Sequence, residues 1–286
     1  MPWMPEVFTA PIAEARRTAG EERANDAGAY YEGILAGEPN ALVRSFAAGQ
    51  PRLNDPRVGY VEGVRGLRAF ASGTADWLRE RDAVVENVAL TRTQARTVEE
   101  VQQHLLLGDE GGRVELPVAI LTDRNPDRTL KAIRVYHSMW PLTGEHAVRP
   151  PLLPADPELH VQGVVGNYQR ALAEGDIESI VGAFEPDGYA REPSGGAYVH
   201  RGAKGLWNLY AHLFANGGGI FLEHCTLTDD SARCAIEYNC IRWGVTGIPA
   251  QAGVAVYERG NSGLLAAARI YDDVSPPDVS DTSSIL

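Results

Sequence analysis

The strongest constraint on the fold is an internal repeat, because one pattern of residues occurs twice along the chain. A tyrosine, a glycine and a phenylalanine recur at one separation of 138 residues (168 − 30, 175 − 37, 184 − 46), at Tyr30 and Tyr168, Gly37 and Gly175, and Phe46 and Phe184. An acid–proline pair and a strand-like run follow in each half, at Asp55-Pro56 and Glu192-Pro193, and at Arg134–His137 and Arg269–Asp272. Solenoid repeats are only about 20–50 residues long, so this repeat indicates two copies of a whole domain.

Length and composition are those of a soluble protein with two domains. The 286 residues suffice for two hydrophobic cores, and 44% hydrophobic with 22% charged residues is ordinary for a globular chain. The net charge of −12 argues against a nucleic-acid partner, which needs clustered Lys and Arg. No stretch approaches the ~20 apolar residues of a membrane helix. We therefore expect neither a nucleic-acid nor a membrane partner.

The amino terminus, the cysteines and the lack of cofactor motifs predict a cytoplasmic protein without metal. Residues 1–6 lack the charged and apolar regions of a signal peptide. Cys225, Cys234 and Cys240 are odd in number and match no zinc spacing, which favours buried, reduced thiols. The histidines show no ligand spacing, and no glycine-rich phosphate loop follows a strand. We expect the protein to need no cofactor.

Both copies show the same predicted order of elements, three helices followed by four strands. In the first copy we expect helices at 12–36, 41–48 and 66–80, extended segments at 53–56 and 60–62, and strands at 83–91, 95–107, 112–123 and 129–140. In the second copy we expect helices at 157–174, 177–184 and 203–214, and strands at 220–228, 232–243, 250–259 and 264–274. Helices followed by antiparallel strands are typical of an α+β domain.

A proline-rich segment over residues 141–157 separates the copies and predicts a stiff, extended linker. The predicted domains are residues 12–140 and 158–277, and residues 278–286 form a tail. Two related domains in one chain can pack as an isologous pair. We therefore predict that the two sheets face each other about a pseudo-two-fold axis, as a pseudo-dimer within one chain. Further oligomerisation is left open.

Four short motifs in the second copy resemble those of a known superfamily. They are residues 168–176, residues 177–188, Glu192-Pro193-Ser194-Gly195 and His200-Arg201-Gly202. The first two look like the first and second helices of a ketosteroid isomerase, and the third looks like the Asp-Pro-x-Gly that carries its base. The fourth looks like the His-Gly-Arg at the start of its third helix, with the last two residues in swapped order. The chain thus resembles the nuclear transport factor 2-like superfamily, nearest its ketosteroid isomerase and SnoaL-like polyketide cyclase branches. This resemblance implies a curved, mostly antiparallel sheet wrapped over three helices, a cone with a pocket inside each copy.

The resemblance also implies roles for residues of the second copy. Tyr168 is similar to the oxyanion-binding tyrosine of the isomerase, and Glu192 is similar to its base. An apolar cone disfavours the charged form of a carboxylate and so raises its pKa, which suits proton transfer near neutral pH. The isomerase is a standard example of pKa tuning and has a second, protonated acid on one of its strands. The matching strand here reads Ala-Gly-Val-Ala-Val at residues 252–256 and contains no acid. This departure argues against steroid isomerisation itself.

The last strand of the second copy supplies a different acid. Alternation places Ala268, Ile270 and Asp272 on one face, and the resemblance turns that face into the pocket. Asp272 would then lie across the cone from Glu192, and two opposed carboxylates can divide the acid and base roles. SnoaL-like cyclases also use an acid near the end of this strand. The neighbouring strand offers Glu237 and Asn239 as substrate-binding residues, although its register can slip by one.

The first copy carries a different set of ionisable residues at the matching positions. Tyr30, Asp55 and His137 occupy the places of Tyr168, Glu192 and Asp272. The adjacent strand carries Glu100, Gln102 and His104 beside them, and Gln102 and His104 are predicted to bind substrate. By residue type, Tyr, Asp and His together resemble the scytalone-dehydratase-like members of the superfamily. A histidine titrates near neutral pH, so this set also suits proton transfer. The second copy keeps the closer motif match, and we expect it to carry the main activity.

Two functional hypotheses follow. The first is a cofactor-independent acid/base enzyme that acts on a small or mid-sized apolar substrate in secondary metabolism. It would catalyse cyclisation, epoxide opening, dehydration or isomerisation. The second is a non-catalytic small-molecule-binding or scaffold protein, because inward tyrosines and acid–proline pairs are also typical of cores and turns. An open apolar pocket with convergent carboxylates would favour the enzyme, and a filled pocket would favour the scaffold.

Overall fold

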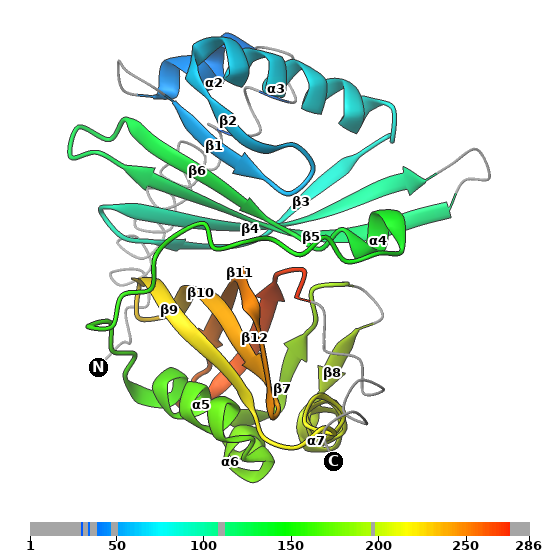
Figure 1. The fold of residues 1–286 in the computed structure, drawn as a ribbon, viewed down its shortest axis with the longest axis vertical. Helices are drawn as coiled ribbons and strands as arrows, with labels where there is room; N and C mark the ends of the chain where they lie inside the picture. Colours follow the sequence, from blue (N-terminus) through cyan, green and yellow to red (C-terminus); the bar gives the residue numbers. More distant parts are fainter. Residues whose placement is uncertain are drawn as a thin grey trace, which may run out of the picture.

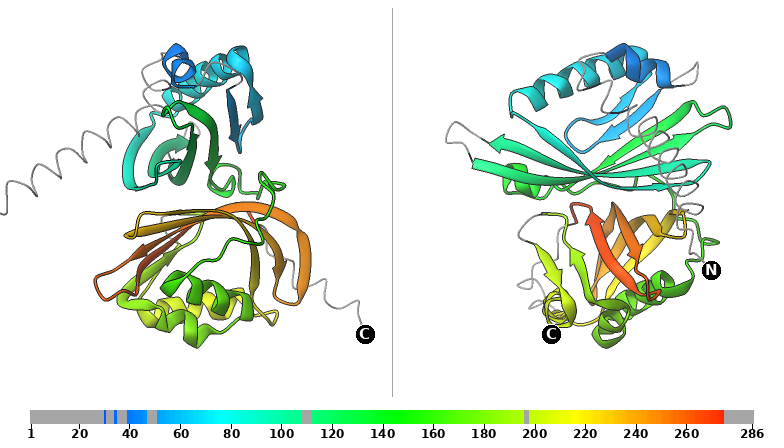
Figure 2. Two further views of the ribbon diagram at one scale, coloured as in Figure 1. Left: turned by 90° about the vertical axis from the view of Figure 1, so that its left-hand side faces the viewer. Right: turned by 180° about the vertical axis from the view of Figure 1, so that it is seen from behind.

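Two six-stranded sheets face each other at the centre of the molecule, and helices cover their outer faces (Figure 1). The computed structural model describes residues 30, 34, 39–46, 51–107, 112–195 and 198–274. The same arrangement of sheets and helices is seen from the side and from behind (Figure 2). The predicted α+β class and the predicted face-to-face pairing of two domains are both confirmed.

The first domain combines a long α-helix with a mostly antiparallel sheet. Its elements are α2 (Pro39–Ser45), β1 (Arg52–Asp55), β2 (Gly59–Glu62), α3 (Gly63–Arg79), β3 (Val84–Arg92), β4 (Arg96–Leu107), β5 (Gly112–Arg124) and β6 (Leu130–Tyr136). The strand order is β2-β1-β6-β5-β4-β3, and only the β1–β6 pair is parallel. Helix α3 buries Leu67, Phe70, Ala71, Thr74 and Leu78 at helical spacing against the sheet. Most of the predicted helix over residues 12–36, and Gly37, lie outside the described residues.

The second domain repeats this arrangement strand for strand. Its elements are α5 (Gly163–Glu174), α6 (Ile177–Gly182), β7 (Phe184–Arg191), β8 (Val199–Arg201), α7 (Gly202–Leu213), β9 (Ile220–Asp229), β10 (Arg233–Trp243), β11 (Thr246–Arg259) and β12 (Leu265–Tyr271). The strand order β8-β7-β12-β11-β10-β9 matches that of the first domain. The hairpin β7–β8 was not predicted. Helix α5 begins six residues later than expected, because its first residue, Gly163, has a φ of +66°, which a right-handed helix cannot continue through toward the amino terminus.

The interface between the sheets is apolar at its centre and contains two matched ionic clusters. Val98, Leu121 and Tyr136 of the first domain pack with Val254, Val256 and Tyr271 of the second. Arg134 on β6 binds Glu237 on β10, with Nε–Oε1 and Nη2–Oε2 distances of 2.5 and 2.8 Å. At the pseudo-symmetric position Arg269 on β12 binds Glu100 on β4 at 2.6 and 2.9 Å. The hydroxyls of Tyr136 and Tyr271 donate to the same two glutamates, at 2.8 and 2.7 Å.

The linker contributes to this interface as well as joining the domains. It begins with a short helix, α4 (Trp140–Thr143). Further along, the Arg149 guanidinium donates to the carbonyl oxygen of Val135 at 2.7 Å and to the side chain of Asn54. The Arg149 carbonyl oxygen accepts from the backbone N–H of Ala252 at 2.9 Å. One linker residue thus bonds β1, β6 and β11, which holds the two domains in one orientation.

Candidate active site

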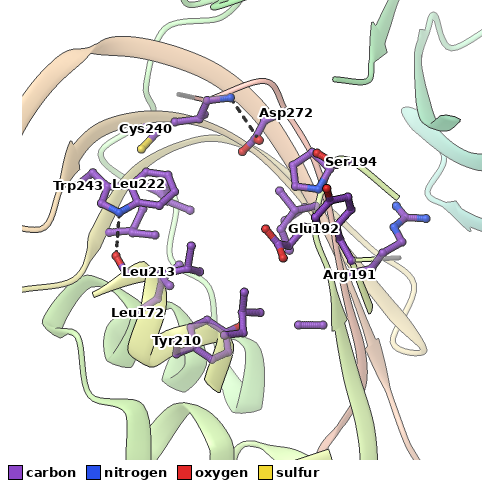
Figure 3. Close-up of a pocket in the computed structure, with 18 of the residues that line it drawn as sticks. Leu172, Arg191, Glu192, Ser194, Tyr210, Leu213, Leu222, Cys240, Trp243 and Asp272 are labelled. Atoms are coloured by element: carbon purple, nitrogen blue, oxygen red, sulfur yellow. Dashed lines mark hydrogen bonds between the residues drawn. The ribbon is translucent and has the colours of Figure 1, made fainter. Parts of the chain in front are cut away.

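The second domain contains a cavity of about 310 Å³ between its helices and the concave face of its sheet (Figure 3). Most of the lining side chains are apolar or aromatic, such as Leu172, Leu213, Leu222, Trp243 and Ile270. Figure 3 shows the carboxylates of Glu192 and Asp272 turned toward the same interior space. An apolar cavity with a few convergent polar groups is the usual form of a small-molecule site.

Glu192 lies just beyond the end of β7, on the loop that leads to β8. Its Oε1 accepts a hydrogen bond from Nε2 of His200 on β8, at 2.6 Å. The Glu192 and His200 side chains are 33% and 27% exposed, and Glu192 borders the cavity, so the carboxylate is open both to the cavity and to the solvent. A base at this position can take a proton from a bound molecule and exchange it with water.

Asp272 follows the end of β12, on the cavity face of that strand as predicted. Its Oδ2 accepts from the hydroxyl of Tyr238 on β10 at 2.6 Å. The Asp272 side chain borders the cavity on one side and is packed against protein atoms on the others. Burial therefore raises the pKa of the Asp272 carboxyl to about 6, although the Tyr238 hydroxyl opposes this shift. A carboxyl with this pKa is partly protonated near neutral pH and can act as an acid.

A group of buried tyrosines forms another part of the wall. The hydroxyls of Tyr168 on α5 and Tyr210 on α7 are 2.7 Å apart. Burial raises the pKa of Tyr168 to about 12, so its hydroxyl keeps its proton and can donate to an oxyanion. On β11 the Tyr257 hydroxyl accepts from Nε2 of Gln169 at 2.6 Å, and Oε1 of Gln169 lies 3.1 Å from Nε2 of His224. These bonds fix the hydroxyls that border the cavity.

The raised pKa of Asp272 predicts a pH-dependent effect of Asp272→Asn on stability. An unfolded aspartate has a pKa of about 3.9, so between pH about 4 and 6 the native state binds more protons than the unfolded state. The free energy of unfolding of the wild type therefore falls as pH rises through this window. Asparagine keeps an acceptor for Tyr238 without the buried charge. We expect the variant to be the more stable protein above pH about 6, by at most roughly 3 kcal/mol.

Urea denaturation of both proteins on either side of that window measures the effect. The stability difference should be near zero at pH about 4 and favour the variant at pH about 7.5. An equal difference at both values would show that Asp272 has an ordinary pKa.

The predicted inward orientation of Glu237 and Asn239 is wrong by one residue. Ile236, Tyr238 and Cys240 face the helices and the cavity, whereas Glu237 binds Arg134 and the Asn239 side chain donates to the carbonyl oxygen of Leu153 at 3.1 Å. β10 is buried on both faces, by the helices and by the other sheet, so burial does not alternate along it. The same error applies to the first domain, where Val101, Gln103 and Leu105 of β4 face inward and Glu100, Gln102 and His104 do not.

The first domain brings Tyr30, Asp55 and His137 together, but around a cavity of only about 10 Å³. Arg57 occupies the place beside Asp55, with Nε 3.4 Å from Oδ1, and donates to Thr74 at 3.0 Å. The guanidinium of Arg57 also stacks on the ring of Trp77, 4.3 Å from its centroid. Burial lowers the pKa of His137, while Asp55 opposes the shift. The predicted set is therefore assembled but closed off by an arginine and a tryptophan.

Four side chains of the second-domain site were not predicted as functional residues. They are His200, Tyr210, Tyr238 and Tyr257. The hairpin β7–β8, in which Ala190 pairs with His200, carries His200 to Glu192. The sequence signals only part of this hairpin, because Glu192-Pro193-Ser194-Gly195 is turn-forming but the three residues of β8 are too few to show a strand pattern. Tyr238 follows from the corrected register of β10.

The described part of the chain contains no group of three or more His, Cys, Asp or Glu residues placed to hold a metal ion. Its three cysteines are free and buried, and burial raises the pKa of Cys234 and of Cys240 to about 12. None of the described helices is both long and apolar enough to cross a membrane.

No protein-family model and no curated protein sequence matches this chain. Among solved structures, the chain is similar to a nuclear transport factor 2-like protein of unknown function from Cytophaga hutchinsonii, with 18% identity over 37% of this chain and 91% of that one and a TM-score of 0.32. A putative polyketide cyclase from Sinorhizobium meliloti has 14% identity over 38% of this chain and 94% of that one, and a TM-score of 0.33. A protein of ketosteroid isomerase-like fold from Catenulispora acidiphila, in complex with trimethylamine, has 16% identity over 41% of this chain and 88% of that one, and a TM-score of 0.34.

These likenesses concern the fold, and each covers about one domain of this chain and most of the other protein. Both domains of this chain have the same six-strand order, with helices on one face of each sheet. The tandem duplication and the α+β class that the sequence predicted are the architecture of this chain, since its two domains share one order of strands.

Proposed function

We propose that the second domain is a cofactor-independent enzyme that moves protons on a small or mid-sized apolar substrate. The observation that carries the proposal is the pair of carboxylates, Glu192 and Asp272, turned into one apolar cavity of about 310 Å³. The two acids have different surroundings, since one bonds a histidine at the rim and the other is buried beside a tyrosine. Different environments for two titratable groups are what an acid/base division of roles requires.

In this proposal Glu192 is the general base and Asp272 is the general acid. Glu192 takes a proton from carbon or oxygen of the substrate, and His200 orients its carboxylate through the 2.6 Å bond. Asp272, with a pKa of about 6, delivers a proton to the oxygen or carbon at the other end of the reacting group. Tyr168 and Tyr210 supply a hydroxyl donor for negative charge on a carbonyl or leaving oxygen. These steps suit cyclisation, epoxide opening, dehydration and double-bond isomerisation.

We propose that the first domain supports this site and does not bind substrate. Its own cavity has about 10 Å³, and Arg57 engages Asp55. It also touches the loop that carries Glu192. Gly195 on this loop has φ of +77°, and a Cβ there would lie 2.7 Å from the Pro117 side chain of β5. This close approach ties the position of the base to the neighbouring domain.

Three probes of different chemistry test the proposed enzyme. They are nitrobenzisoxazole for carbon deprotonation, styrene oxide for epoxide opening and a β,γ-unsaturated cyclohexenone for isomerisation. With nitrobenzisoxazole the carbon-bound proton passes to Glu192, the N–O bond breaks, and its electron pair leaves on the phenolate oxygen. We expect the wild type to turn over at least one probe faster than the buffer does.

Filling the cavity should abolish that turnover. Ala255 on β11 borders the cavity, so Ala255→Phe would place its ring in the space that the substrate needs. We expect turnover to fall to the buffer rate while thermal unfolding still shows a folded protein. Turnover that survives this substitution would put the reaction outside the cavity. Probe binding without turnover of any probe by the wild type would favour the alternative, a non-catalytic small-molecule-binding protein.

A further inference from the structure

The first turn of the linker lies at the mouth of the second-domain cavity. Trp140 and His146 from this turn border the cavity. Their rings are stacked, with centroids 4.9 Å apart and an interplanar angle of 26°. Trp140 is 41% exposed, so the stacked pair faces both the cavity and the solvent. A molecule entering the cavity would therefore meet this aromatic surface.

The buried carboxylate of Asp273 holds this turn in place. It accepts four hydrogen bonds, from Ser138 Oγ at 2.6 Å, from the backbone N–H of Met139 at 2.9 Å, from His146 Nδ1 at 2.8 Å and from the backbone N–H of Ala147 at 2.6 Å. Asp273 is only 3% exposed, and charge-assisted bonds to a buried carboxylate are strong. The stacked pair is thus a fixed part of the site, built from a segment outside the second domain.

The bond to Asp273 also sets the tautomer of His146. A carboxylate only accepts hydrogen bonds, so Nδ1 of His146 carries the hydrogen. In the neutral ring, Nε2 then has a lone pair and is an acceptor on the side of the ring away from Asp273. Within the described residues, the hydrogen bond of His146 is the one that its Nδ1 makes with Asp273, which leaves Nε2 available to a ligand.

We propose that Trp140 and His146 recognise a planar hydroxylated substrate, a phenol or an enol, whose ring packs on the stacked pair and whose O–H donates to Nε2 of His146. The proposal rests on the proposed function, because it names the substrate class of the same cavity. An aromatic surface favours a flat, conjugated molecule, and an oriented acceptor distinguishes a hydroxyl from an ether of the same shape. His146 is then a specificity-determining residue supplied by the linker.

Fluorescence titration with β-naphthol and its methyl ether tests this proposal. The two probes share the ring system, and the ether carries a methyl group in place of the hydroxyl hydrogen. We expect the wild type to bind the naphthol about 3–10-fold more tightly than the ether, the usual effect of one hydrogen bond. His146→Phe keeps a stacking ring but removes the acceptor, and should bind the two probes equally. His160→Phe, the same exchange at a residue that does not border this cavity, should keep the wild-type preference.

A second variant keeps the test decisive if His146→Phe does not fold. Trp140→Leu removes half of the stacked pair and leaves Nε2 in place, so it should weaken both probes while preserving their ratio. Equal binding of the two probes by the wild type, no binding of either, or a preference that persists in His146→Phe would each overturn the proposal. These outcomes are separate from the proposed function, which is judged by turnover of the chemical probes and does not depend on naphthol binding.

Discussion

Arg269→Met should lower the free energy of unfolding by about 3–5 kcal/mol, the usual cost of leaving one charge of a buried ion pair without its partner. Glu100, the residue that loses its partner, is 0% exposed and would keep only the Tyr271 hydroxyl as a donor at the interface. Burial disfavours the charge on Arg269, but Glu100 more than offsets this and raises the pKa of the guanidinium. Arg269 is therefore charged in the native protein, and removing it leaves the buried Glu100 side chain without its cationic partner.

Urea denaturation of a double-mutant cycle separates this effect from simple loss of packing. Glu100→Gln combined with Arg269→Met removes both charges and keeps an acceptor for Tyr271, so it should recover most of the lost stability. Arg259→Met is the matched control, because Arg259 pairs with Asp229 at the protein surface, where an ion pair contributes about 0–1 kcal/mol. If Arg269→Met and Arg259→Met are equally destabilised, the interface clusters do not hold the domains together.

The order of elements could be predicted from the repeat because the two copies constrain each other. The constant separation of Tyr30 and Tyr168, and of Phe46 and Phe184, makes the two halves of the chain equivalent position by position over this stretch. The orientation of Ile270 and Asp272 was also predicted correctly, since the resemblance identified the inward face of the last strand. Both predictions rest on features that extend over many residues.

The register of β10 could not be predicted, because it depends on a contact between the domains. A strand with one solvated face alternates between buried and exposed residues, but β10 is covered by helices on one face and by the other sheet on the second. Glu237 is buried and binds Arg134 across the interface, and Arg134 lies 103 positions away in the chain. Nothing local to Glu237 indicates that partner.

Two further parts of the site come from segments without a clear local signal. β8 has only three residues, so the hairpin that brings His200 to Glu192 is too short to give a strand pattern. Trp140 and His146 lie in and beside a segment whose prolines indicate only an extended linker. Their position at the cavity is set by the bonds that Asp273 makes after the chain has folded.

Glu192→Gln should lower turnover of the reactive probe by ~10²–10⁴-fold, the usual contribution of a general base. Glutamine has the size of glutamate and keeps an oxygen that can accept from His200, so the geometry of the rim is preserved. It has no basic carboxylate, so the proton of the substrate has no acceptor. The side chain is partly exposed, and we expect the melting temperature to change little.

Asp55→Asn is the matched control, since it makes the same kind of exchange at the equivalent position of the first domain. Asp55 borders a cavity of about 10 Å³ and engages Arg57, so no substrate reaches it in the proposed function. Its substitution should leave turnover unchanged, even if the loss of the contact with Arg57 lowers stability.

The measurement that tests the central claim most directly is kcat/KM of the wild type, Glu192→Gln and Asp55→Asn on the same probe. Placing the active site in the second domain predicts a loss of ~10²–10⁴-fold in Glu192→Gln and wild-type values in Asp55→Asn. Wild-type values in Glu192→Gln together with a large loss in Asp55→Asn would place the active site in the first domain and contradict the account.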